Sequence, residues 1–140
     1  MNLRRAGVVL GLWLALAAGA RGADAPQAQL SVLYFHRTAR CPSCVNLEAY
    51  TAEAAARFAA EREAGRILFR AINLDDANDR HFEQDYALEF SSVVLSRRVN
   101  GQEAAWTNLP DVWALAGDKS NFIAYIEMEI SKQLEQLPKH

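Results

Sequence analysis

The sequence predicts an α/β domain with the order β-α-β-α-β-β-α, a four-stranded mixed sheet with helices on both faces. Three observations support this fold class. Short apolar runs rich in β-branched and aromatic residues alternate with longer segments of helical periodicity. A helical stretch between the first two runs is long enough to bring the chain back for a parallel strand. Asn100-Gly101 separates the last two runs and is typical of a tight hairpin.

Residues 1–22 have the features of a secretory signal peptide. Arg4 and Arg5 precede an uncharged apolar run at 6–20, and small residues follow where a signal peptidase reads. As a helix the run would span about 22 Å, less than the roughly 30 Å hydrocarbon core, so an uncleaved membrane anchor is the less favoured alternative. Cleavage before Ala23 would deliver the chain to a secreted or periplasmic location, where disulfides persist.

The chain expected after cleavage is small and acidic. Removing residues 1–22 from 140 leaves 118 residues, enough for one domain with a single core. The loss of three arginines leaves 12 basic against 17 acidic residues, so the net charge moves from −2 to −5. The basic residues are scattered. This pattern argues against a nucleic-acid partner, and no membrane span is expected after cleavage.

The domain is expected over residues 30–138, after a short polar tether at 23–29. Residues 30–35, LSVLYF, form the first strand, and a long helix follows from Pro42 to about Ala64. Gly65 stands where a helix C′ glycine is favoured, and residues 67–73 form the second strand.

The second part of the domain contains two more strands and two more helices. We expect Asn78 to cap a short helix that ends at Tyr86. Residues 92–99 and 102–108 form an antiparallel hairpin, and a helical turn follows at 110–115. Asp118 caps a last helix that runs to about residue 137, with one apolar face made of Phe122, Ile123, Ile126, Ile130 and Leu134.

The two cysteines, Cys41 and Cys44, lie where the first strand gives way to the first helix. If Pro42 is the first helical residue, Cys41 is the N-cap. Its sulfur would then face free backbone N–H groups and the positive end of the helix dipole, which favour the thiolate. Arg37 and Arg40 would add positive charge nearby, and Cys44, one turn further in, would be more shielded.

This arrangement resembles the thioredoxin fold over about residues 30–137. The segments 73–75 (NLD), 86–88 (YAL) and 93–95 (VVL) look like parts of thioredoxin's second strand, second helix and third strand. More narrowly, FHRTARCPSC, EAYT, SVVL and VWALAGDK resemble a family of small secreted thioredoxin-like proteins. Its members carry the label nitrophenyl compound nitroreductase subunit and an arsenic-related gene name. The chain has no flavin-binding signature for reducing a nitro group alone.

The sequence departs from thioredoxin at positions that matter for the chemistry. Pro42-Ser43 replaces Gly-Pro between the cysteines, and no Trp precedes Cys41. Phe35 stands where thioredoxin has a buried Asp. Ser91 stands where thioredoxin has the cis-proline that faces the disulfide. Proton handling and substrate docking would therefore both differ from those of thioredoxin.

Three interpretations of the cysteine pair remain open. A purely structural disulfide is the least favoured, because closing so short a loop stabilises a fold by only about 2 kcal/mol. A soft ion such as Cu(I), or trivalent arsenic, could bind the two thiolates, with His36 as an added ligand. His81 and His140 are more remote in the sequence, and we interpret them as ordinary surface or core residues. The redox interpretation is favoured by the strand-to-helix position.

We therefore interpret the chain as an extracytoplasmic thiol–disulfide oxidoreductase with Cys41 and Cys44 as its catalytic residues. The residues predicted to face or activate the pair are Pro42, Arg40, Arg37 and Ser91. No cofactor is expected beyond the Cys41–Cys44 disulfide, and the expected partner is a protein dithiol or disulfide, with a membrane electron donor as one source of electrons. A dithiol metal carrier and an electron-transfer subunit are the alternatives. Trp106 and Trp113 either pack the sheet end or form an exposed docking pair.

Overall fold

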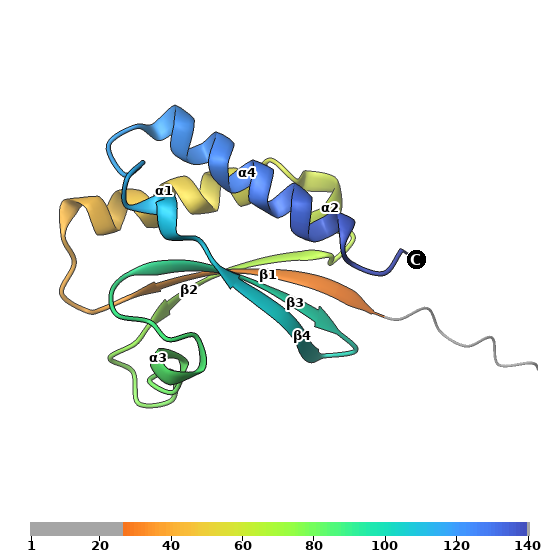
Figure 1. Ribbon diagram of the computed structural model, residues 1–140, viewed down its shortest axis with the longest axis horizontal. Helices are drawn as coiled ribbons and strands as arrows, with labels where there is room; N and C mark the ends of the chain where they lie inside the picture. Colours follow the sequence, from red (N-terminus) through yellow and green to blue (C-terminus); the bar gives the residue numbers. More distant parts are fainter. Residues whose placement is uncertain (1–26, 140) are drawn as a thin grey trace, which may run out of the picture.

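The computed structural model describes residues 27–139, and these form a four-stranded sheet with helices on both faces (Figure 1). The predicted signal peptide, residues 23–26 of the tether and His140 lie outside the described residues. The elements in chain order are β1 (Ala28–His36), α1 (Pro42–Ala56), α2 (Ala59–Glu63), β2 (Ile67–Asn73), α3 (Phe82–Asp85), β3 (Ser92–Val99), β4 (Gln102–Asn108), a 3-10 turn η1 (Pro110–Val112) and α4 (Lys119–Glu135).

The sheet has the strand order β2-β1-β3-β4. β1 pairs parallel with β2 and antiparallel with β3, and β3 pairs antiparallel with β4. The mixed sheet and the element order are those of the thioredoxin-like α/β fold, so the predicted fold class is confirmed. The C-terminal end of β1, the start of α1 and the start of β3 meet at one end of the molecule, at the left in Figure 1.

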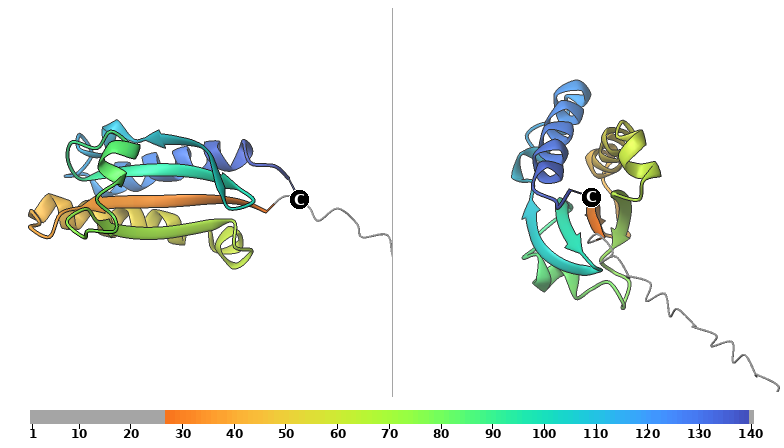
Figure 2. Two further views of the ribbon diagram at one scale, coloured as in Figure 1. Left: turned by 90° about the horizontal axis from the view of Figure 1, so that it is seen from below. Right: turned by 90° about the vertical axis from the view of Figure 1, so that its right-hand side faces the viewer.

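Alternating residues of β1 send side chains into two cores. Leu30, Val32 and Tyr34 belong to the main core beneath α1 and α4. Leu33 and Phe35 belong to a smaller core that α3 closes on the opposite face. The views in Figure 2 show α1 and α4 side by side over the sheet and α3 under its other face. Both faces of β1 are buried, as expected of a strand that is mostly apolar over residues 30–35.

The predicted Asn100-Gly101 turn and the predicted Asp118 cap are confirmed. Asn100 and Gly101 both have positive φ, 52° and 79°, as a type I′ turn requires. β3 and β4 have the predicted bounds. The Asp118 side chain accepts a hydrogen bond of 3.1 Å from the Asn121 N–H and so caps α4. The four residues Phe122, Ile123, Ile126 and Ile130 are buried, whereas Leu134 is half-buried.

Two boundaries in the first half differ from the prediction. β1 begins at Ala28, so the last part of the predicted tether belongs to the sheet, where Ala28 pairs with Val99. The prediction of a single helix from Pro42 to Ala64 is wrong, because α1 ends at Ala56 and a separate short helix, α2, follows. Phe58 lies at the break with φ −90° and ψ 53°, and its ring packs onto the main core.

The helix predicted from Asn78 to Tyr86 is also shorter than expected. Turns occupy most of residues 74–81, and α3 contains only Phe82–Asp85. Asn78 does not cap it, since the N-cap position is His81, whose side chain makes no capping bond. Phe82 and Tyr86 stack at 5.7 Å between ring centroids and pack against Phe35. This aromatic packing fixes the segment against the sheet.

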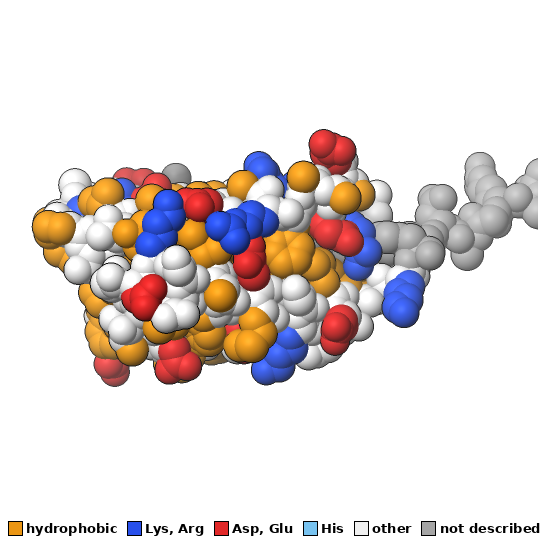
Figure 3. Space-filling model, turned by 90° about the horizontal axis from the view of Figure 1, so that it is seen from above, with side chains coloured by type: hydrophobic (Ala, Val, Ile, Leu, Met, Phe, Trp, Pro, Cys, Tyr) orange, Lys and Arg blue, Asp and Glu red, His pale blue; other side chains and the backbone are white. Residues whose placement is uncertain are grey.

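The helical face carries a mixed charge pattern. Figure 3 shows acidic and basic side chains interspersed over this face, with apolar side chains between them. Within residues 27–139, no helix combines the length and the hydropathy needed to cross a bilayer.

Candidate active site

The two cysteines form a disulfide at the N-terminus of α1, with their Cα atoms 5.1 Å apart. Cys41 is the N-cap, with φ −82° and ψ 159°, and Pro42 is the first helical residue, as predicted from the sequence. The Cys44 backbone N–H donates to Cys41 Sγ over 3.1 Å. Cys41 is exposed and Cys44 is half-buried, so the first sulfur is the one an incoming group can reach.

The first turn of α1 favours negative charge on Cys41. It contains no acidic residue, and its backbone N–H groups point towards the cap. A Cys41 thiolate, formed on reduction, would keep the Cys44 N–H as a hydrogen-bond donor. Charge-assisted bonds of this kind are about twice as strong as neutral ones.

The Tyr34 side chain contacts the first turn of α1. It is fully buried, and its hydroxyl donates to the Cys44 carbonyl oxygen over 2.6 Å. Burial raises the pKa of the Tyr34 phenol, against the lowering effect of the nearby Ser91 side chain and Arg40 guanidinium. The hydroxyl is therefore a neutral donor at physiological pH. Sequence reasoning missed this residue, although a tyrosine in a buried strand usually has a polar partner.

Arg40 is beside the pair but its charge is balanced. The guanidinium forms an ion pair with Glu48, one turn beyond Cys44, and lies 5.8 Å from the centroid of the Tyr34 ring. The sequence predicted that Arg40 adds positive charge near the pair, and it did not indicate Glu48 as its partner. The ion pair reduces the help that Arg40 gives to a thiolate.

Arg37 also has carboxylate partners. It pairs with Asp75 over 3.1 Å and with Glu83 on the other side of the loop. Asp75 accepts a second bond of 2.8 Å from the Thr38 N–H, and this bond, with Arg37, holds the pKa of the Asp75 carboxyl below its usual value. Arg37 therefore fastens the loop before Cys41 to the connection between β2 and α3.

Ser91 lies at the same end of the sheet. It is buried, it precedes β3, and its side chain lies close to the Tyr34 hydroxyl. The Ser91 carbonyl accepts a bond of 2.8 Å from Trp113 Nε1. The Phe90 ring before it is exposed and meets Trp113 edge to face, 6.0 Å between centroids. Ser91 therefore lies at the end of the sheet that carries the cysteine pair, close to the Tyr34 hydroxyl.

Within residues 27–139, His36 and His81 each have a partner other than the cysteines. His36 Nδ1 lies 3.0 Å from the Arg37 carbonyl oxygen, and its ring stacks on Tyr34 at 5.9 Å. His81 contacts Asp85 at 2.7 Å on α3. In the part of the chain that the structure describes, no group of three His, Cys, Asp or Glu side chains is placed to hold a metal ion.

Trp106 and Trp113 do not form a pair. Trp113 is half-buried against the main core and Ser91. Trp106 is 41% exposed and meets Tyr86 edge to face on the α3 side of the sheet. The alternative of one exposed docking surface made by both is therefore wrong.

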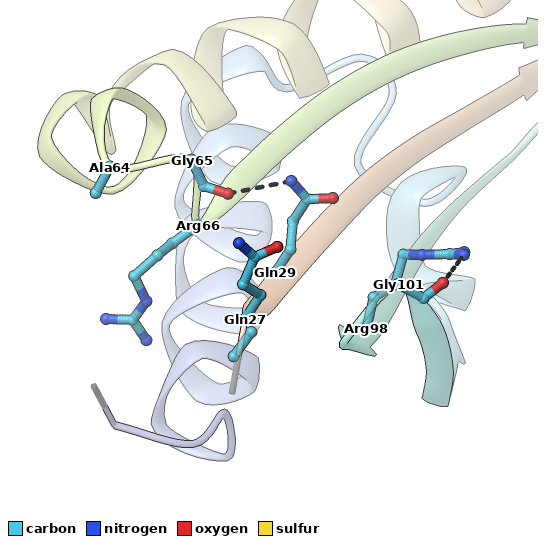
Figure 4. A pocket seen from close by; sticks show the side chains of 8 residues that line it. Gln27, Gln29, Ala64, Gly65, Arg66, Arg98 and Gly101 are labelled. Atoms are coloured by element: carbon cyan, nitrogen blue, oxygen red, sulfur yellow. Dashed lines mark hydrogen bonds between the residues drawn. The ribbon is translucent and has the colours of Figure 1, made fainter. Parts of the chain in front are cut away.

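A recess of about 470 Å³ lies away from the cysteines (Figure 4). Gln29 and Arg98 line it, and each makes a bond to a backbone oxygen there, on Gly65 and Gly101. The recess lies at the other end of β1, so it does not adjoin the disulfide. Cys41 is an exposed residue and does not line this recess.

Comparison with known proteins adds little to this geometry. No family model matches the chain, and no curated protein matches it. A solved structure titled "Structure of a malarial protein" is similar over 65% of this chain and 97% of its own, with 17% sequence identity and a TM-score of 0.40. A likeness at that level says nothing about what this chain does.

Proposed function

We propose that the chain is an extracytoplasmic, thioredoxin-like thiol–disulfide oxidoreductase with Cys41 as its nucleophile and Cys44 as its resolving thiol. The observation that carries the proposal is the disulfide at the N-terminus of α1, with Cys41 exposed at the cap and Cys44 behind it. The sequence resemblance to small secreted thioredoxin-like proteins supports the same function. A disulfide and the predicted signal peptide support an oxidising compartment.

The proposed exchange proceeds in two thiol–disulfide exchange steps. In the reduced protein, the Cys41 thiolate attacks one sulfur of a partner disulfide, forms a mixed disulfide and expels the partner's other sulfur as a thiolate. Cys44 then loses its proton and attacks Cys41 Sγ, which releases the second partner thiolate. Two electrons pass from the chain to the partner, and the Cys41–Cys44 disulfide remains. The reverse sequence oxidises a partner dithiol.

Trapping of the mixed disulfide tests this function. The Cys44→Ala variant, expressed with its signal, retains the attacking sulfur and lacks the resolving one, so it should accumulate higher-mass adducts that a reductant dissolves. Cys41→Ala is the matched control, because it also keeps one thiol but should form few adducts. The double variant reports the background.

A dithiol carrier would give a different pattern. Each single substitution removes one of its two ligands, so both should abolish tight 1:1 binding of Cu(I) or trivalent arsenic. Tight binding by the unmodified protein, lost equally in both variants and without adducts in either, would replace the oxidoreductase with the carrier.

A further inference from the structure

We infer that Tyr34 is a positioning residue for the cysteine pair: its hydroxyl holds the first turn of α1 in the geometry that stabilises a Cys41 thiolate. This inference rests on the proposed function, since it concerns the dithiol–disulfide equilibrium of the same cysteine pair. The Tyr34 hydroxyl bonds to the Cys44 carbonyl oxygen and not to a sulfur, so it acts through the Cys44 backbone.

The hydroxyl joins an interior strand of the sheet to the turn that holds the disulfide. Tyr34 lies in β1, one of the two interior strands of the sheet, opposite Ala71 of β2 and Val93 of β3. Its ring is fully buried, so the position of the hydroxyl is set by the core. The bond to the Cys44 carbonyl therefore anchors this turn to the centre of the sheet.

Two further hydrogen bonds connect the Cys44 turn to Cys41. The Cys44 N–H donates to Cys41 Sγ over 3.1 Å, and the Val45 N–H donates to the Cys41 carbonyl oxygen over 3.2 Å. A Cys44 backbone that is fixed at its carbonyl presents its N–H to the sulfur in a defined direction. Hydrogen bonds weaken steeply as their angle departs from linearity, so a loosened turn stabilises the thiolate less.

The anchor needs a protonated phenol. Burial raises the pKa of Tyr34, and this keeps the hydroxyl a donor over the physiological range. Phenylalanine has the same ring and lacks only the donor. Tyr34→Phe therefore removes the anchor while keeping the core filled.

A matched control is available on the opposite face of the sheet. Tyr86 is also buried and also donates a bond of 2.6 Å, in its case to Glu103. Tyr86→Phe also removes one phenolic hydrogen bond, and it should lower the urea midpoint at least as much, because Glu103 is a charged acceptor. Tyr86 lies in the smaller core, apart from the turn that holds the disulfide.

Equilibration of both variants and the unmodified protein with glutathione buffers tests the inference. We expect Tyr34→Phe to shift the dithiol–disulfide equilibrium towards the disulfide by about tenfold, a potential about 30 mV more reducing. Tyr86→Phe should leave the equilibrium unchanged. An unchanged equilibrium in Tyr34→Phe, or an equal shift in both variants, overturns the inference and leaves the proposed function standing. If the unmodified pair fails to exchange with glutathione at all, the proposed function fails and the inference with it.

Discussion

Reduction of the disulfide should reveal one acidic thiol and one ordinary thiol. The single-thiol variants Cys44→Ser and Cys41→Ser isolate Cys41 and Cys44 respectively. In the first variant the remaining sulfur is the exposed N-cap, which faces the amides of the first turn. In the second, the remaining sulfur is half-buried within the turn. We expect the pKa of Cys41 to lie below that of an ordinary thiol.

The size of the effect follows from the bond that the structure shows. A hydrogen bond to a charged group contributes about 1.5–3 kcal/mol. The Cys44 N–H is 3.1 Å from Cys41 Sγ, so one such bond would become charge-assisted on ionisation. Since 1.36 kcal/mol corresponds to a tenfold change in an ionisation constant, Cys41 should ionise about 10- to 100-fold more readily than a free thiol. The helix dipole acts in the same direction.

Alkylation rates measured from about pH 4 to pH 10 give both ionisation constants. Arg37→Gln in the Cys44→Ser background is an informative control. Because the Arg37 side chain is 51% exposed, solvent and salt screen its charge, and its loss should change the ionisation constant by less than about twofold. Superimposable pH profiles for the two single-thiol variants, both at the position of a free thiol, would refute the reasoning.

Three further outcomes are expected. Glu48→Gln frees the Arg40 guanidinium, so the ionisation constant of Cys41, followed by alkylation, should rise about two- to fivefold; a fall would contradict this. Ser91→Pro should change the rate of disulfide exchange by about threefold or more, with less than about 1 kcal/mol lost in urea unfolding; unchanged exchange in a folded variant would show that Ser91 does not influence the pair. Burial and then Glu103 raise the pKa of Tyr86 from 10.0 to about 12. The protonated phenol therefore stabilises the fold below about pH 10, and this contribution should fade as the pH approaches 12. The difference in unfolding free energy between the unmodified protein and Tyr86→Phe should therefore become smaller between about pH 10 and pH 12.

Local signals account for the parts of the fold that the sequence predicted well. Asn100-Gly101 adopts positive φ at both residues, and Asp118 satisfies an amide of its own helix, so each feature depends on a few neighbouring residues. The runs at 92–99 and 102–108 pair across that turn, which fixes their register. Helix capping by Cys41 was predictable for the same reason, because Pro42 marks the first helical position.

Tertiary packing explains the boundaries that were missed. No glycine or proline marks the break between α1 and α2, where Phe58 packs onto the main core. The shortness of α3 reflects the aromatic packing of Phe82 and Tyr86 against Phe35, across more than 40 residues of chain. Helical periodicity alone cannot show where such contacts end a helix.

The electrostatics of the site were the least predictable part. The motif located both cysteines, and proximity in sequence suggested that Arg37 and Arg40 would add free positive charge. The structure pairs Arg37 with Asp75, 38 positions away, and Arg40 with Glu48. It also brings the Tyr34 hydroxyl beneath Cys44. These partners depend on the folded arrangement of β1, α1 and the connection after β2.

The reduction potential of the cysteine pair in metal-free, unmodified protein tests the central claim most directly. An oxidoreductase should interconvert between dithiol and disulfide in glutathione buffers, as a two-electron couple with a potential between about −270 and −120 mV. Quantitative thiol labelling at each buffer ratio gives the value. A pair that stays oxidised at every ratio, with a potential below about −300 mV as structural disulfides have, would contradict a redox role for Cys41 and Cys44.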